Sequence, residues 1–242
     1  MLTKMAPILS RTTKRAPRSS DAPPGEAEPR LGAGELAARL RNQMADHDIP
    51  PGARLREWDL ATEYGVPRLV ARDALDRLIQ LGFADRQPNR GVVAHRFGIE
   101  ELLRLYDMRE VNEGLCARLA AHNARAEIWD DLIETFGDKM ADIVERKDFD
   151  AYSTQYERLR ARLITVADSP PLAALLERLN DMTRIVGRRM LLVSDRATHA
   201  LNDHRAVLTA LRAGDPCAAE QLRRATIRNV KEAVWRYHAF LL

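Results

Sequence analysis

The fold is decided by residues 55–83, which read LREWDLATEYGVPRLVARDALDRLIQLGF. This stretch predicts a helix from about Glu57 to Tyr64, a turn at Gly65 and a second helix that begins near Pro67, because glycine suits a helix end and proline a helix start. The apolar residues expected to point inward from the second helix are Val70, Ala74, Leu75 and Leu78. Two helices joined in this way form a helix-turn-helix.

The neighbouring segments extend this unit into a small domain. Upstream, apolar residues four apart between Leu36 and Met44 predict a helix, which the sequence IPPG at 49–52 ends. Downstream, residues 83–95 indicate two short strands around a turn, which is the pattern of a β-hairpin. We therefore predict a winged helix-turn-helix domain over residues 31–98, made of three helices and a hairpin wing.

The rest of the chain has a different character. Beyond Gly98 the pattern is almost continuously helical, with breaks at residues 168–171 and 214–216, and no stretch reads as a strand. The predicted helices cover residues 99–123, 127–146, 149–168, 171–193, 197–213 and 216–240. The fold is therefore expected to be mainly α, with an all-helical bundle over residues 99–242.

Residues 1–30 lack a hydrophobic period and are rich in proline, so we expect a disordered arm. Six basic side chains against three acidic ones give this arm a net charge of +3. It either contacts DNA phosphates or remains a solvated tail.

Composition excludes several classes of protein. No apolar run reaches the length of a membrane span, and residues 1–30 contain no apolar h-region of a signal peptide, so we expect a cytoplasmic protein. The two cysteines, Cys116 and Cys217, lie in helical stretches without metal-ligand spacing, which favours buried reduced thiols. The chain also has no glycine-rich phosphate loop, no GxSxG motif and no cluster of metal ligands, so we expect no enzyme activity.

Several side chains of the first domain are candidates for DNA contact. Arg68 and Arg72 stand four apart on the face of the second helix that is opposite Val70, where arginine can bind guanine or a phosphate. The alternative is that they pair with acids of the same helix, such as Asp76. The hairpin turn offers Asn89, Arg90 and Gly91, which suit a minor groove or backbone, although an ordinary surface turn has the same composition.

The motifs of residues 55–91 together resemble the winged helix-turn-helix of the GntR family of bacterial regulators, and IPPG at 49–52 fits the turn between its first two helices. The resemblance implies DNA contacts by Arg56, Arg68, Arg72 and the hairpin turn. The sequence departs from the family where Pro67, Leu69 and Val70 replace the usual Ser, Thr and Pro. Hydroxyl groups that cap the recognition helix in the family are therefore missing here.

Residues 99–235 resemble, more loosely, the FCD domain of the FadR branch of that family. The matching segments are Leu105–Glu113, Leu119–Ala121, Asp203–Ala210, Gly214–Asp215 and Ala219. Many FCD domains hold a divalent metal with one Asp and three His. The corresponding positions here are Tyr156, Arg160, His204 and Thr226, so we predict no metal and no other cofactor.

The substituted residues indicate a different ligand. Tyr156 and Arg160 lie one helical turn apart, and with His204 and Thr226 they are expected to face the cavity where the family holds its metal. A guanidinium there would bind a carboxylate, with Arg109 as a second clamp. The alternative is that these polar groups satisfy one another in a filled core.

The sequence therefore predicts a homodimeric transcriptional regulator that binds operator DNA, because helix-turn-helix dimers recognise paired half-sites. The family resemblance implies a repressor of a catabolic or metabolic operon, released by a small organic acid. The alternative is a winged-helix regulator whose helical domain only dimerises.

Overall fold

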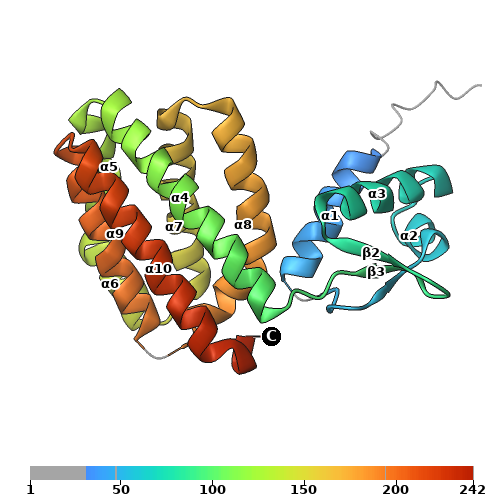
Figure 1. Ribbon diagram of the computed structural model, residues 1–242. Helices are drawn as coiled ribbons and strands as arrows, with labels where there is room; N and C mark the ends of the chain where they lie inside the picture. Colours follow the sequence, from blue (N-terminus) through green and yellow to red (C-terminus); the bar gives the residue numbers. More distant parts are fainter. Residues whose placement is uncertain (1–30, 47, 194, 242) are drawn as a thin grey trace, which may run out of the picture. The chain divides into compact units, whose positions relative to one another are not determined.

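The computed structural model describes residues 31–46, 48–193 and 195–241 (Figure 1). The predicted arm, residues 1–30, lies outside the described residues. The part before Gly98 combines helices with a small sheet, and the part after it is helical, as the sequence predicts.

The first part is a winged helix-turn-helix. Its elements are α1 (Ala33–Ala45), β1 (Arg54–Leu55), α2 (Glu57–Glu63), α3 (Arg68–Leu81), β2 (Ala84–Gln87) and β3 (Gly91–Ala94). The antiparallel hairpin β2–β3 pairs Ala84 with Ala94. The sequence did not predict β1, because two residues carry no alternation; it pairs with β3 and gives the sheet the order β1-β3-β2.

The predicted turns form where glycine can adopt a positive φ. Gly65 between α2 and α3 has φ +63°, and Gly82, which caps α3, has φ +82°. The buried face of α3 consists of Ala71, Ala74, Leu75 and Leu78. The prediction that Val70 points inward is only partly correct, since Val70 is half-buried and the helical period places Ala71 in the core instead.

The described residues of the helical part form six helical segments, and the segment over residues 126–145 is divided into shorter pieces. Its elements are α4 (Ile99–Asn123), a 3₁₀ turn (Ala126–Trp129), α5 (Asp130–Glu134), a π turn (Thr135–Lys139), α6 (Met140–Glu145), α7 (Phe149–Ala167), α8 (Pro170–Met190), α9 (Arg196–Arg212) and α10 (Pro216–Leu241).

The prediction of one helix over residues 127–146 is wrong. The backbone leaves helical geometry at Gly137, where φ is −75° and ψ is −133°. The guanidinium of Arg205 donates hydrogen bonds to the carbonyls of Phe136 (2.6 Å) and Gly137 (2.8 Å). Arg205 therefore satisfies carbonyl groups that the broken helix leaves without their regular partners.

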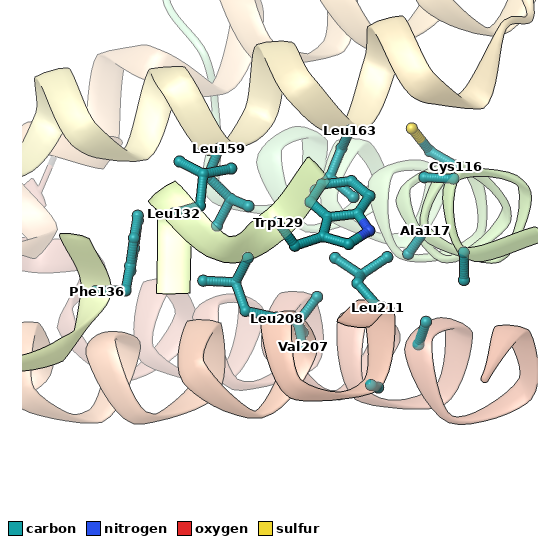
Figure 2. Close-up of a cluster of buried hydrophobic side chains, with 14 of the residues drawn as sticks. Cys116, Ala117, Trp129, Leu132, Phe136, Leu159, Leu163, Val207, Leu208 and Leu211 are labelled. Atoms are coloured by element: carbon teal, nitrogen blue, oxygen red, sulfur yellow. The ribbon is translucent and has the colours of Figure 1, made fainter. Parts of the chain in front are cut away.

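The main hydrophobic core of the helical part is built around Trp129, which is fully buried (Figure 2). Leu159 and Leu163 of α7 lie on one side of the indole, and Val207 and Leu211 of α9 lie on the other. Burying a large aromatic side chain among aliphatic ones contributes several kcal/mol, so this cluster joins the broken helix to the bundle.

The two cysteines differ in exposure. Cys116 is buried in the main core, whereas Cys217 is exposed in the first turn of α10, so the prediction of a buried thiol is wrong at Cys217. The helical period explains the difference, because Ala219 occupies the buried face of that turn. In the part of the chain that the structure describes, no helix is long and apolar enough to span a membrane.

Helices α4 and α10 lie side by side (Figure 1). Gly114 of α4 permits their close approach, because a Cβ at this position would overlap the Cγ and Cδ atoms of Arg224 on α10. Arg224 is also held by an ion pair to Glu110, so its side chain has little freedom to move away.

We predict that Gly114→Ala lowers the free energy of unfolding. Overpacking costs about 1–3 kcal/mol, which outweighs a helix-propensity gain of at most about 1 kcal/mol. Urea denaturation measures the difference. The control is Gly187→Ala in α8, where an added Cβ meets no described atom within 4 Å and stability should stay constant or rise. Equal stabilisation by both substitutions would contradict the close contact.

Candidate functional site

The exposed face of α3 presents the two predicted arginines. Arg68 and Arg72 are both exposed. Asp76, which was the suggested partner, instead pairs with Arg86 at 2.8 Å, and Arg68 lies 3.9 Å from a carboxylate oxygen of Glu57. Arg72 has no hydrogen bond or ion pair to any described residue, so its guanidinium is available to a partner molecule.

The wing and α2 place the remaining candidates at the surface. Asn89 has φ +63° and Gly91 has φ +77°, which turns the chain sharply between β2 and β3 and exposes Arg90. Arg56, at the start of α2, is exposed and lies 3.8 Å from Asp59. All six predicted DNA-contacting residues are thus at the surface of this domain.

Two exposed apolar side chains of this domain were not among the predicted DNA-contacting residues. Leu69, between the arginines of α3, is 67% exposed, and Trp58 of α2 is 64% exposed. A signal existed for Leu69, because it replaces a polar residue of the family at the start of the recognition helix. An apolar side chain at such a place suits the methyl group of thymine.

The helical part contains a cavity of about 680 Å³ between α4, α7, α8, α9 and α10. All five residues that were predicted to bind the effector line this cavity, namely Arg109, Tyr156, Arg160, His204 and Thr226. Helix periodicity explains this convergence, because each helix turns one face towards the bundle interior. The cavity is within the size range of small-molecule sites.

A buried ionic cluster lies beside this cavity. Glu113 accepts a hydrogen bond from Nε of Arg109 (2.8 Å) and pairs with Arg223 of α10. Arg109 also donates to the hydroxyl of Thr183 (2.7 Å), and Arg223 donates to that of Tyr156 (3.1 Å). Burial by itself would raise the pKa of Glu113, but Arg109 and Arg223 outweigh it and lower the pKa to about 2.

His204 is buried and neutral. Its ring stacks on Tyr156 at 5.0 Å between centroids and meets the edge of Phe136 at 5.8 Å. Burial, followed by the positive charges of Arg223 and Arg196, lowers the pKa of His204 to about 3. Its Nδ1 has no hydrogen-bond partner among the described residues.

The other two predicted residues already have protein partners. Arg160 is buried and donates to Glu157 and Glu177, each at 3.0 Å. Thr226 donates to the carbonyl of Leu222 at 2.9 Å. Arg109, Arg160 and Thr226 therefore have hydrogen-bond partners within the protein, whereas Nδ1 of His204 has none among the described residues.

Arg196, Arg223 and Tyr152 are buried and were not among the predicted site residues. Arg223 lies in phase with the buried residues Ala219 and Ile227 on α10, so its burial was readable from the helical period. The adjacent Arg224 concealed this signal, because a pair of arginines suggests a solvated face.

These residues do not fit a divalent metal. Among the four positions that ligate metal in related domains, only His204 is a usual metal ligand. The guanidinium groups of Arg196 and Arg223 disfavour positive charge at His204, and they would repel a cation in the same way. Within the described ranges, no group of three or more His, Cys, Asp or Glu side chains could hold a metal ion.

Comparison with known families decides the classification. The model of bacterial regulatory proteins of the gntR family matches residues 33–93, and that of the FCD domain matches residues 104–229. The chain belongs to the GntR family. It is a transcriptional regulator with an FCD domain, and the proteins that it resembles are regulators rather than enzymes.

Relatives of this GntR-family chain include two proteins named as operon regulators. The "Probable D-xylose utilization operon transcriptional repressor" of Paenarthrobacter nicotinovorans is 27% identical over 200 residues, 79% of this chain and 85% of that protein. The "Nta operon transcriptional regulator" of Aminobacter aminovorans is 29% identical over 171 residues, 70% of this chain and 79% of that protein.

Solved structures with the same fold include those of two bacterial proteins. McbR/YncC of E. coli has a TM-score of 0.68 and 19% identity, covering 85% of this chain and 98% of that one. A GntR regulator from Rhodococcus sp. RHA1 has a TM-score of 0.64 and 22% identity, covering 84% and 97%. At these identities the likeness shows the fold alone.

We predict that Glu113→Gln destabilises this GntR-family regulator by about 3–5 kcal/mol, because the substitution leaves two buried guanidinium groups without their carboxylate. Urea denaturation at pH 7 measures the loss. The contribution of Glu113 is present above its unfolded pKa and is lost as the pH falls towards about 2.

The matched control is Glu100→Gln, which breaks an exposed pair with Arg104 in the same helix, at 3.2 Å. Exposed pairs of this spacing contribute about 0.3–0.5 kcal/mol, so this variant should remain almost as stable as the wild type. Similar losses in the two variants would show that the Glu113 cluster is not the stabilising interaction.

Proposed function

We propose that this regulator is a homodimeric repressor of a catabolic or metabolic operon, which binds operator DNA through residues 31–98 and is released by a small organic acid bound within residues 99–242. The observation that carries the proposal is the cavity of about 680 Å³, because arginine side chains dominate its buried charge. An anion is the ligand that such surroundings favour.

DNA binding is supported by the distribution of positive charge on the first domain. Arg68 and Arg72 are exposed on the recognition helix, and Arg56, Asn89, Arg90 and Gly91 are exposed around it. Two domains of this size in a dimer would read half-sites about one DNA turn apart. Repression is the mode named for the relative from P. nicotinovorans.

The effector proposal is supported by the positions of Arg109, Tyr156, Arg160, His204 and Thr226 around one cavity. These side chains come from four helices, α4, α7, α9 and α10, so a ligand that contacts them would change how the helices pack. A ligand shifts a conformational equilibrium only through such differential contacts.

A second candidate function is that the helical domain only dimerises. The observation in its favour is an exposed apolar surface on α4, where Met108 is 47% exposed and Val111 is 56% exposed. Side chains of this kind are typical of subunit interfaces. This function is compatible with DNA binding but requires no effector.

We predict that Arg72→Ala weakens binding to a cognate duplex by about 1–3 kcal/mol, which is roughly a 5- to 150-fold higher Kd. The duplex is the one that the wild-type protein selects from a random-sequence pool, and fluorescence anisotropy measures the Kd. The reason is that Arg72 offers an unpaired guanidinium on the exposed face of α3.

The control is Arg77→Ala, in the same helix but on another face, where Nη1 of Arg77 lies beside Gly34 of α1. Its Kd should equal that of the wild type. Unchanged binding by Arg72→Ala would contradict the proposed DNA-contacting face.

We also predict that an organic acid both raises the thermal midpoint of the full-length protein and lowers its affinity for the selected duplex, with no divalent metal required. Differential scanning fluorimetry against a panel of acids, with EDTA or with Mn²⁺ or Zn²⁺, measures the first effect. Stabilisation by metals alone would contradict the metal-free site, and the absence of stabilisation by any acid would favour the dimerisation function.

A further inference from the structure

Arg196, the first residue of α9, is a buried arginine with two nitrogens that have no partner among the described residues. Its side chain lines the cavity and only 7% of the residue is exposed. Neither Nε nor Nη2 forms a hydrogen bond, and no described carboxylate forms an ion pair with Arg196. Leaving a buried guanidinium unpaired costs several kcal/mol, so the fold retains an unfavourable group at this point.

The two free nitrogens define the shape of the missing partner. Nε and Nη2 lie on the same edge of the planar guanidinium, and their N–H bonds point in parallel. Both atoms are fully buried in the ligand-free structure, so a carboxylate reaches this edge only when the side chains that cover it move. Once reached, the edge accommodates the two oxygens of one carboxylate in a bidentate hydrogen-bonded pair. A neutral hydrogen-bond acceptor would satisfy at most part of it.

The other buried arginines around the cavity are already paired. Arg109 is bound by Glu113 and Thr183, and Arg160 by Glu157 and Glu177. Arg223 also has two nitrogens without partners, but it lines a separate pocket of about 10 Å³, which holds at most about one water molecule. Among the described residues that line the main cavity, no other buried guanidinium is therefore left for a second carboxylate.

The remaining lining of the cavity suits a largely apolar body with one or two hydroxyl groups. Tyr152 and His204 both line the cavity, and the buried hydroxyl of Tyr152 and Nδ1 of His204 have no hydrogen-bond partner among the described residues. The apolar residues of the lining include Met190, Leu191, Ala200, Ile227 and Val230, and its acidic residues include Glu157, Glu177 and Asp181. The apolar side chains favour a hydrocarbon chain or ring, and the acidic ones disfavour a second carboxylate on the ligand.

We propose that Arg196 anchors the effector by side-on binding of a single carboxylate, and that the effector is a monocarboxylic acid with a mainly apolar body. This inference rests on the proposed function, because it names the chemistry of the ligand in the same cavity. It replaces Arg160, which the sequence suggested, with a residue whose guanidinium edge is free.

The test combines ligand binding with the stability of the ligand-free protein. The probes are butyrate, hexanoate, octanoate and phenylacetate, with succinate, adipate and suberate as matched dicarboxylates. Thermal unfolding and titration calorimetry on the full-length protein should show that one or more monocarboxylates bind more tightly than the dicarboxylate of the same chain length. Arg196→Gln should weaken this binding by at least about tenfold, and Arg196→Lys should weaken it less, because lysine keeps the charge but not the bidentate edge.

The control variant is Arg212→Gln, at the exposed end of the same helix, where Arg212 pairs with Asp130 outside the cavity. Its affinity for the acids should equal that of the wild type. Without ligand, Arg196→Gln should have a higher thermal midpoint than the wild type, because it removes an unpaired buried charge. A purely structural arginine would give the opposite result.

The outcomes separate this inference from the proposed function. Equal acid binding by the wild type and Arg196→Gln, tighter binding of dicarboxylates, or a lower thermal midpoint of ligand-free Arg196→Gln would each overturn the role of Arg196. Acid binding that depends on Arg196 but leaves the affinity for DNA unchanged would support the anchor and overturn the proposed release from DNA. If an acid releases the protein from DNA and Arg196→Gln still binds that acid, the proposed release from DNA is supported and the role of Arg196 is overturned.

Discussion

Glu113 holds the guanidinium groups of Arg109 and Arg223 together in the interior of the helical domain. Transfer of these charges out of water is expensive, and the cost is offset only while all three side chains keep their partners. Helices α4 and α10 are therefore joined by an interaction that tolerates little change in their spacing. Tyr156 of α7 and Thr183 of α8 extend the same network to two further helices.

This cluster of Glu113, Arg109 and Arg223 sets the electrostatic potential in the neighbouring cavity. One carboxylate serves two guanidinium groups, so the cluster keeps a net positive charge beside the cavity. Arg196 adds a further positive charge, and both Arg196 and Arg223 disfavour protonation of His204. Under the proposed function, the site that many FCD domains fill with a cation receives an anion in this protein. Arginine supplies the charge permanently, whereas a metal site depends on the supply of metal.

The same residue type has opposite environments in the two halves of the chain. Arg68 and Arg72 are exposed to water, where a guanidinium costs nothing to maintain and can meet a phosphate or a base edge. Arg109, Arg196 and Arg223 are buried, where each needs a partner. The composition and net charge of the chain do not reveal this difference in burial, because they count every arginine alike.

The local features of the fold were readable from the sequence because they depend on neighbours along the chain. Helical periodicity, the glycines at 65 and 82 and the hairpin turn predict α1 to α4 and α7 to α10 closely. Local information was insufficient at β1, which exists only because β3 pairs with it, and at Gly137, where Arg205 stabilises a break. Residues Tyr156, Arg160, His204 and Thr226 were placed around one cavity by family resemblance. Only the tertiary structure decided which of the arginines is paired, because burial and hydrogen bonding between helices depend on residues that lie far apart in the sequence.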